Sequence, residues 1–233
     1  MARNLTLIAF DADDTLWHCE HLFHLTQEQF SKMLADFTEP DHLHARLIEV
    51  EKRNVGQYGF GVKGFVLSMI ETAIEVTQGR VPAPVIGQLL AAGREMLAQP
   101  IELLPGVRPT LEQCAASHRL LLITKGDLLD QERKLAQSGL GDLFDGVEIV
   151  SEKTAPVYER IFQYHGHGAR RAMMVGNSLK SDVVPALAAG AWGVYVPSDK
   201  TSALEHADMP KQEGRFHEIA ALAELGEIVE TIG

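Results

Sequence analysis

The stretch LTLIAFDADDT, residues 5–15, joins a short run of apolar residues to a cluster of acidic ones. The run at 5–10 is continuous and rich in strand-forming residues, as expected for a strand that is buried on both faces of a parallel sheet. It ends directly before Asp11, Asp13 and Asp14. Because ligands of an open parallel sheet bind beyond the carboxyl ends of its strands, these aspartates are predicted to lie at a functional site.

Four later runs resemble the first in length and apolar character, and each is bounded by Gly, Ser, Thr or Asn. They are 119–123, 147–150, 171–175 and 192–196. Helical patterns alternate with them at 107–117, 127–138, 155–165 and 182–189. This alternation predicts an α/β fold with a doubly wound, Rossmann-like parallel sheet.

The segment at 17–100 follows a different pattern and contains no convincing strand. It reads as four amphipathic helices that are separated by prolines and by a glycine-rich stretch. The expected helices are roughly 20–37, 41–54, 62–78 and 83–98. We therefore expect two domains, an α/β core formed by 1–16 and 101–233 and a small all-helical domain at 17–100.

Composition restricts the classes of partner. Lys and Arg number 21 and Asp and Glu number 32, so the formal net charge is −11. Such an acidic surface repels phosphate backbones, which argues against a non-specific nucleic-acid binder. No run approaches the ~20 apolar residues of a membrane span, and no signal peptide is evident. Cys19 and Cys114 form no disulfide framework, so we expect a cytoplasmic protein, with monomer and homodimer both plausible.

Asp11 and Asp13 are expected to project in the same direction, because residues two apart in an extended segment share a face. Two crowded carboxylates are stable mainly when a cation lies between them or when one is protonated. Either state suits catalysis. An acidic turn that caps a helix is the structural alternative.

Polar residues also follow the other predicted strands. Thr124, Lys125 and Gly126 end the second strand and can offer hydroxyl and backbone donors to a phosphoryl oxygen. Lys153 follows the third strand and can neutralise charge on such a group. Each signal alone is an ordinary turn or cap, but their placement at successive strand ends indicates one shared site.

The fourth strand leads into GNSLKSD, residues 176–182. Asn177 and Asp182 supply oxygen ligands of the kind that Mg²⁺ prefers. Asp182 is expected near the start of a helix, with its carboxylate facing the strand ends.

Together these motifs resemble those of the haloacid dehalogenase-like superfamily, in the family's order and over the whole predicted core. The matching motifs are DADDT at 11–15, the strand ending in Thr124, Lys153, and GNSLKSD at 176–182. The helical segment after the first motif resembles the cap domain of many members. The resemblance implies an enzyme of the phosphatase type that acts on a small phosphorylated metabolite with Mg²⁺ as cofactor.

The resemblance also implies roles for individual residues. Asp11 resembles the nucleophile that forms an aspartyl-phosphate, and Asp13 resembles the general acid and base. Thr124 and Lys153 resemble the residues that position the phosphoryl group and balance its charge. Mg²⁺ would be bound by Asp11, by the backbone carbonyl of Asp13, and by the fourth motif.

The fourth motif of the family usually begins Gly-Asp, whereas here the second residue is Asn177. An amide oxygen lacks the charge of a carboxylate, so we expect somewhat weaker metal binding and leave open whether Asn177 or Asp182 is the direct ligand. An acid at Asp13 favours phosphatases and phosphomutases over dehalogenases, because halide leaves without a proton. A phosphomutase, a 2-haloacid dehalogenase and a non-catalytic binding protein are the alternatives to a phosphatase.

Substrate contacts are expected from residues beside the motifs. Lys125 and Gly126 would lie near the phosphoryl group, and Trp17 would either line the pocket or pack at the hinge. The glycine-rich stretch at 54–64 is either a loop over the active site or a plain turn between helices. In the first case Tyr58 or Lys63 would contact the non-phosphate part of the substrate.

Overall fold

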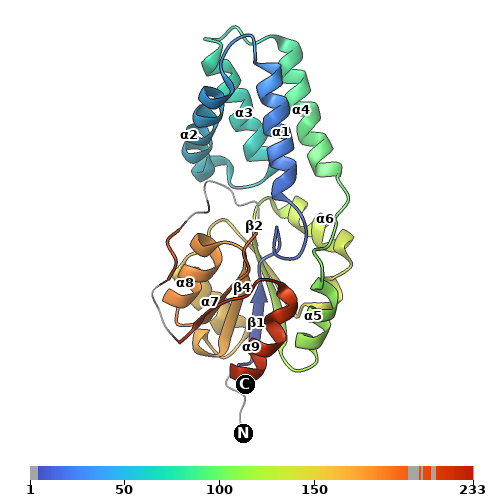
Figure 1. Cartoon of the computed structure of the whole chain (residues 1–233), viewed down its shortest axis with the longest axis vertical. Coiled ribbons are helices and arrows are strands. Elements are labelled where there is room, and N and C mark those ends of the chain that lie inside the picture. The colour runs from blue at the N-terminus through green and yellow to red at the C-terminus, as the bar shows by residue number, and fades with distance from the viewer. Residues whose placement is uncertain (1–4, 199–204, 206, 211–213, 233) are drawn as a thin grey trace. The chain divides into compact units, whose positions relative to one another are not determined.

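A computed structural model describes residues 5–198, 205, 207–210 and 214–232. Contacts between Cα atoms divide the chain into two compact units, whose elements are drawn in Figure 1. The α/β unit comprises 1–18, 101–125 and 131–233, and the helical unit comprises 19–100 and 126–130. None of the helices in the described residues has the length and apolar character that a bilayer crossing requires.

The α/β unit is built on a parallel sheet that has six strands within the described residues, in the order β3-β2-β1-β4-β5-β6. The strands are β1 (Leu7–Phe10), β2 (Arg119–Lys125), β3 (Gly146–Val150), β4 (Ala172–Gly176), β5 (Trp192–Tyr195) and β6 (Phe216–Glu218). Strand β1 pairs with β2 on one side and with β4 on the other. The predicted α/β class with a parallel, Rossmann-like sheet is thus confirmed. Strand β6 was missed, because Phe-His-Glu forms no apolar run.

Strand β1 is buried on both faces, which explains its continuous apolar sequence. Because side chains alternate along a strand, Ile8 and Phe10 enter one core cluster while Leu7 and Ala9 enter the other. The first cluster includes residues of α5 and α9, and the second includes residues of α7 and α8. These helices are α5 (Val107–Ala115), α7 (Ala155–His165), α8 (Val184–Ala188) and α9 (Leu225–Ile232). Helices therefore cover both faces of the sheet (Figure 1).

Two connections of the α/β unit matter for the site. Helix α6 (Leu128–Ser138) follows β2, and its residues from 131 onward belong to the α/β unit. After β4 the chain forms a wide π-helical turn, Leu179–Val183, before α8 begins. The helix predicted at 182–189 therefore begins with a different kind of turn. Ser178 caps this turn, because its hydroxyl accepts a hydrogen bond from the backbone N–H of Ser181.

The helical unit contains α1 (Glu20–Met33), α2 (Pro40–Tyr58), α3 (Val62–Val76) and α4 (Ala83–Ala98). The predicted end of the second helix at 54 is wrong, because α2 continues to Tyr58. Only 59–61 separate it from α3, so this part of the glycine-rich stretch is a short turn between helices. Gly56 is an exposed position of α2, where one glycine costs about 1 kcal/mol. Burial of Leu47 and Val50 on the same helix outweighs that cost.

Candidate active site

The carboxyl end of β1 places Asp11 in the interior of the α/β unit. The backbone N–H of Asp11 still donates to the carbonyl of Val175, so the residue is fixed by the sheet itself. The chain then turns sharply, and the N–H of Leu16 donates to the carbonyl of Ala12. Only 7% of Asp11 is exposed, so its carboxylate is held in a fixed place with little access to bulk water.

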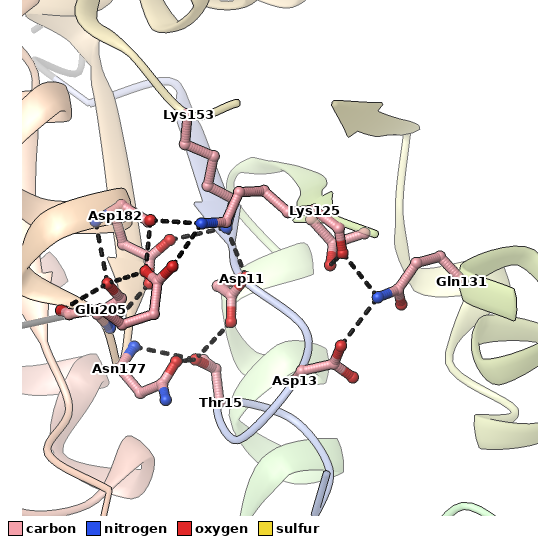
Figure 2. A network of polar contacts seen from close by, with 12 residues as sticks. Asp11, Asp13, Thr15, Lys125, Gln131, Lys153, Asn177, Asp182 and Glu205 are labelled. Carbon is pink, nitrogen blue, oxygen red and sulfur yellow. Dashed lines mark hydrogen bonds and ion pairs between the residues drawn. The ribbon is translucent and has the colours of Figure 1, made fainter. Parts of the chain in front are cut away.

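The ammonium of Lys153 lies between two carboxylates that are distant in the sequence. Lys153 Nζ donates to Asp11 Oδ1 and, at 2.7 Å, to Asp182 Oδ1. Figure 2 shows the three side chains converging from different strand ends. All three are at least nine-tenths buried, so the predicted convergence of Asp11, Lys153 and Asp182 is present in the fold.

This cluster carries one positive and two negative charges when all its groups are ionised. Burial raises the pKa of Asp11, and the attraction of Lys153 only partly opposes this, so that with the repulsion of Asp182 the pKa reaches about 7. Burial alone would lower the pKa of Lys153, but the two carboxylates raise it. The site therefore favours the uptake of further positive charge, either as a proton on Asp11 or as a bound cation.

Thr15 and Asn177 extend the site on the other side of Asp11. The Thr15 hydroxyl lies 3.1 Å from Asp11 Oδ2 and 3.2 Å from Asn177 Oδ1. Since it has one proton, it donates to only one of these oxygens at a time. The backbone N–H of Asn177 donates to the same hydroxyl at 3.1 Å. Thr15 was part of the quoted DADDT motif, but sequence reasoning gave it no role.

Asp182 can approach the strand end because Gly176 has no side chain. A Cβ atom added at Gly176 would lie 2.2 Å from Asp182 Oδ2, far inside van der Waals contact. That oxygen accepts the backbone N–H of Ser178 at 2.9 Å. The glycine of the GNSLKSD motif thus provides the space in which a buried carboxylate is held.

We expect Gly176→Ala to destabilise the protein by about 1–3 kcal/mol or more, because the methyl group displaces a buried charge from its partners. Thermal unfolding measures the change. Gly87→Ala is the matched control, because Gly87 lies in α4 with no atom within 4 Å of its added Cβ. There alanine should be neutral or stabilise by up to ~1 kcal/mol. Equal melting temperatures for the two variants would contradict the steric explanation.

The Asp13 carboxylate is directed away from this cluster, toward α6 (Figure 2). It accepts hydrogen bonds from Trp17 Nε1 at 2.7 Å and from Gln131 Nε2 at 2.8 Å. Lys134 Nζ lies 3.0 and 3.1 Å from its two oxygens. Burial would raise the pKa of Asp13, but Lys134 and the hydrogen bonds hold it below its usual value. Gln131 and Lys134 were not predicted as site residues.

A second polar cluster adjoins the fourth motif. Glu205 Oε1 lies 2.6 Å from Lys125 Nζ, and its Oε2 accepts the hydroxyls of Ser178 and Ser181. Lys125 Nζ also donates to Ser181 Oγ at 2.7 Å. Burial would raise the pKa of Glu205, but Lys125 and the three hydrogen bonds lower it to about 2. Lys125, expected near the substrate, is thus engaged with Glu205.

Glu205→Gln is expected to destabilise the protein by about 3 kcal/mol at pH 7, since the pKa falls from 4.5 to about 2 and each unit is worth about 1.4 kcal/mol. A carboxylate whose pKa is lowered in the folded state stabilises the protein at pH values above its unfolded-state pKa. The difference in unfolding free energy between the wild type and Glu205→Gln should therefore be full above about pH 4.5 and shrink as the pH falls toward 2. Urea unfolding at several pH values measures it, with the exposed Glu230→Gln as control. A difference independent of pH would contradict the charge explanation.

The other residues that were predicted to contact the substrate lie in different parts of the structure. Thr124 is buried at the end of β2, and its hydroxyl donates to the carbonyl of Lys125 at 3.3 Å. Trp17 is fully buried, so it packs in the core and presents no surface to a ligand. Tyr58 is half exposed at the end of α2, and Lys63 forms an exposed ion pair with Asp127 at 2.9 Å. These last residues, like Gly126, belong to the helical unit.

The donors at the strand ends fit a hard divalent cation by their chemistry. Asp11 and Asp182 offer carboxylate oxygens, Asn177 an amide oxygen, and Asp13 a backbone carbonyl. The space that Gly176 leaves for Asp182 and the excess negative charge support this fit. Throughout the described part of the chain, no three His, Cys, Asp or Glu side chains are grouped as metal ligands.

The chain matches the family model of the haloacid dehalogenase-like hydrolases over residues 5–190. A solved haloacid dehalogenase-like family hydrolase from Xanthomonas campestris is 39% identical, with a TM-score of 0.87 over 99% of this chain and 93% of the other. The chain therefore belongs to the haloacid dehalogenase-like hydrolase family, as the motifs indicated. None of the curated proteins matches it.

More distant structures share the fold. The L-2-haloacid dehalogenase from Xanthobacter autotrophicus, solved with chloropropionic acid covalently bound, is 16% identical, with a TM-score of 0.68 over 98% of this chain and 100% of the other. A phosphatase of the same family from Thermococcus onnurineus is 23% identical, with a TM-score of 0.58 over 97% and 98%. Dehalogenases and phosphatases therefore both occur with this fold, so the two activities must be distinguished by the residues of the site.

Proposed function

We propose that this hydrolase is a magnesium-dependent phosphatase that cleaves small phosphate monoesters with Asp11 as the nucleophile. The observation that carries the proposal is the presence of two carboxylates, Asp11 and Asp13, just beyond the end of β1 in different surroundings. Asp11 is buried against the ammonium of Lys153, while Asp13, two residues on, is held separately by α6. One carboxylate is thus available to attack and the other to transfer protons.

The reaction requires two displacements at phosphorus. An Asp11 oxygen attacks the phosphorus atom, the bond to the ester oxygen breaks, and Asp13, which must first take up a proton, gives that proton to the departing alcohol. Asp13 then takes a proton from water, whose oxygen attacks the aspartyl-phosphate. This second step breaks the acyl phosphate bond, releases inorganic phosphate and restores the Asp11 carboxylate.

Most of the acceleration must come from charge and position, because acid and base assistance supplies only about 10²–10⁴ of the rate. Lys153 places a fixed ammonium against the attacking carboxylate. Mg²⁺ bound by Asp11, Asp182, Asn177 and the Asp13 carbonyl would neutralise charge on the phosphoryl oxygens. Thr124, at the end of the neighbouring strand, is proposed to donate its hydroxyl to the phosphoryl group.

Asp13 is the main argument for a phosphatase over a dehalogenase. A halide leaves carbon without a proton, whereas an alkoxide leaves phosphorus readily only when it is protonated. The dehalogenases that resemble this chain are too distant to indicate more than the fold. We also infer that the helical unit contributes substrate selectivity, with Tyr58 and Lys63 as candidates, and that the substrate is a small phosphorylated metabolite.

The test is release of inorganic phosphate from p-nitrophenyl phosphate and from a panel of phosphorylated metabolites. We expect turnover with Mg²⁺ and its loss with EDTA. Chloride release from 2-chloropropionate is measured in parallel, and chloride without phosphate would overturn the proposal. Conversion of a sugar phosphate to its isomer without net phosphate release would indicate a phosphomutase instead.

A further inference from the structure

The Asp13 carboxylate is surrounded by donors from its own chain. Trp17 Nε1 and Lys134 Nζ lie at Oδ1, and Gln131 Nε2 and Lys134 Nζ lie at Oδ2. The four contacts range from 2.7 to 3.1 Å and approach both oxygens. A carboxylate fixed on both oxygens has one orientation instead of several.

Two of these donors are three residues apart on α6 and therefore share one face of the helix. Gln131 and Lys134 are 4% and 7% exposed, so both are buried. Gln131 Nε2 donates to the carbonyl of Lys125 as well as to Asp13, each at 2.8 Å. In the resting, unprotonated form of Asp13 both partners are acceptors, which requires the NH₂ group rather than the amide oxygen of Gln131 to face them. The end of β2 therefore anchors the side chain that holds Asp13.

We propose that Gln131 and Lys134 are positioning residues that fix the orientation of the Asp13 carboxylate for proton transfer to the leaving oxygen. The inference rests on the proposed phosphatase function and deepens it. Neither residue touches the substrate. Both act through Asp13, and Trp17, which lies just beyond the first motif, donates to the same carboxylate.

The energetic reason is the geometric demand of proton transfer. A general acid must lie within hydrogen-bond reach of the departing oxygen, and a displacement of 1 Å in such a site can cost about 10²-fold in rate. Without Lys134, Asp13 loses contacts to both oxygens and can rotate about its side-chain bonds. The loss of rate should appear only with substrates whose leaving group needs a proton.

The experiment compares two aryl phosphates of similar size with Lys134→Met. The p-nitrophenolate ion leaves readily without a proton, whereas the phenolate ion of phenyl phosphate depends more on one. We expect kcat for phenyl phosphate to fall at least about tenfold more than kcat for p-nitrophenyl phosphate. Lys134→Arg, which keeps the charge and the donors, should recover part of the loss. Glu132→Met, at an exposed position on the same helix, should change neither rate.

Several results would overturn the inference. Equal losses for both esters, or a gain in rate, would show that Lys134 has only a structural role or restrains the enzyme, while the phosphatase function itself would stand. A wild-type protein inert toward both esters would instead overturn the proposed function, and the catalytic role of this positioning with it.

A crystal structure of Gln131→Leu tests the geometry without reference to activity and covers the case in which Lys134→Met fails to fold. We expect the Asp13 carboxylate to turn away from its position against α6, because the donor at Oδ2 from Gln131 is lost. An unmoved carboxylate in this variant would overturn the positioning role.

Discussion

Asp11→Asn should remove at least about 10³-fold of the phosphatase activity and at the same time stabilise the folded protein above pH 7. The amide keeps the shape of the side chain but cannot form the acyl phosphate. It also removes one of two buried negative charges that share a single ammonium. Loss of function and gain of stability are therefore expected from one substitution, as is common at catalytic sites.

The sign of the stability change follows from the pKa of Asp11, which is raised from 3.8 to about 7 in the folded state. A carboxyl group whose pKa is raised in the folded state stabilises the protein fully at pH values below its unfolded-state pKa. This stabilisation is lost as the pH rises through its folded-state pKa. This rise in pKa corresponds to a loss of at most about 4 kcal/mol in the free energy of unfolding at high pH. The advantage of Asp11→Asn should thus be absent near pH 4, grow between 4 and 7, and be complete above 7.

Urea unfolding from pH 4 to 8 without metal measures the stability, and phosphate release with Mg²⁺ measures the activity. Asp142→Asn, an exposed aspartate in the same unit, is the control and should change neither. Retained turnover in Asp11→Asn would contradict the nucleophile assignment. A stability difference of the opposite sign at pH 8 would show that Lys153 stabilises the ionised Asp11 more than burial and Asp182 destabilise it.

The sequence allowed the sheet and most of the charge cluster to be predicted, because both depend on local pattern. Strands buried on both faces must be continuous apolar runs, and parallel strands end at one edge. These two rules placed Asp11, Lys153 and Asp182 together in advance. Strand β6 escaped notice because three residues at the end of a sheet need little apolar surface.

The contacts of Asp13 and Lys125 could not be predicted from the same rules. Asp13 bonds to Gln131 and Lys134, which on their own read as polar residues of an amphipathic helix. Glu205 lies 80 residues beyond Lys125 in a stretch without any element pattern. Such partners depend on how helices and loops pack on the sheet, and side-chain periodicity carries no information about that packing.

Lys153→Met should have the largest effect on stability, in the direction opposite to that of Asp11→Asn. It removes the ammonium that both Asp11 and Asp182 contact and leaves two buried carboxylates facing each other. Breaking a buried ion pair from one side costs about 3–5 kcal/mol. The cost should fall as the pH is lowered and Asp11, whose pKa burial raises to about 7 in the wild type, becomes protonated. Thermal unfolding at pH 5 and 8 measures it, with the exposed Lys52→Met as control.

The double variant Asp11→Asn/Lys153→Met separates repulsion between the carboxylates from a simple loss of packing. If repulsion dominates, Asp11→Asn should recover more stability in the Lys153→Met background than in the wild type, with a coupling of about 1–3 kcal/mol at pH 8. Additive effects would mean that Lys153 acts mainly through its packed methylene chain. Millimolar Mg²⁺ should raise the melting temperature of Lys153→Met more than that of the double variant, because only the former keeps both carboxylates that a divalent cation would join.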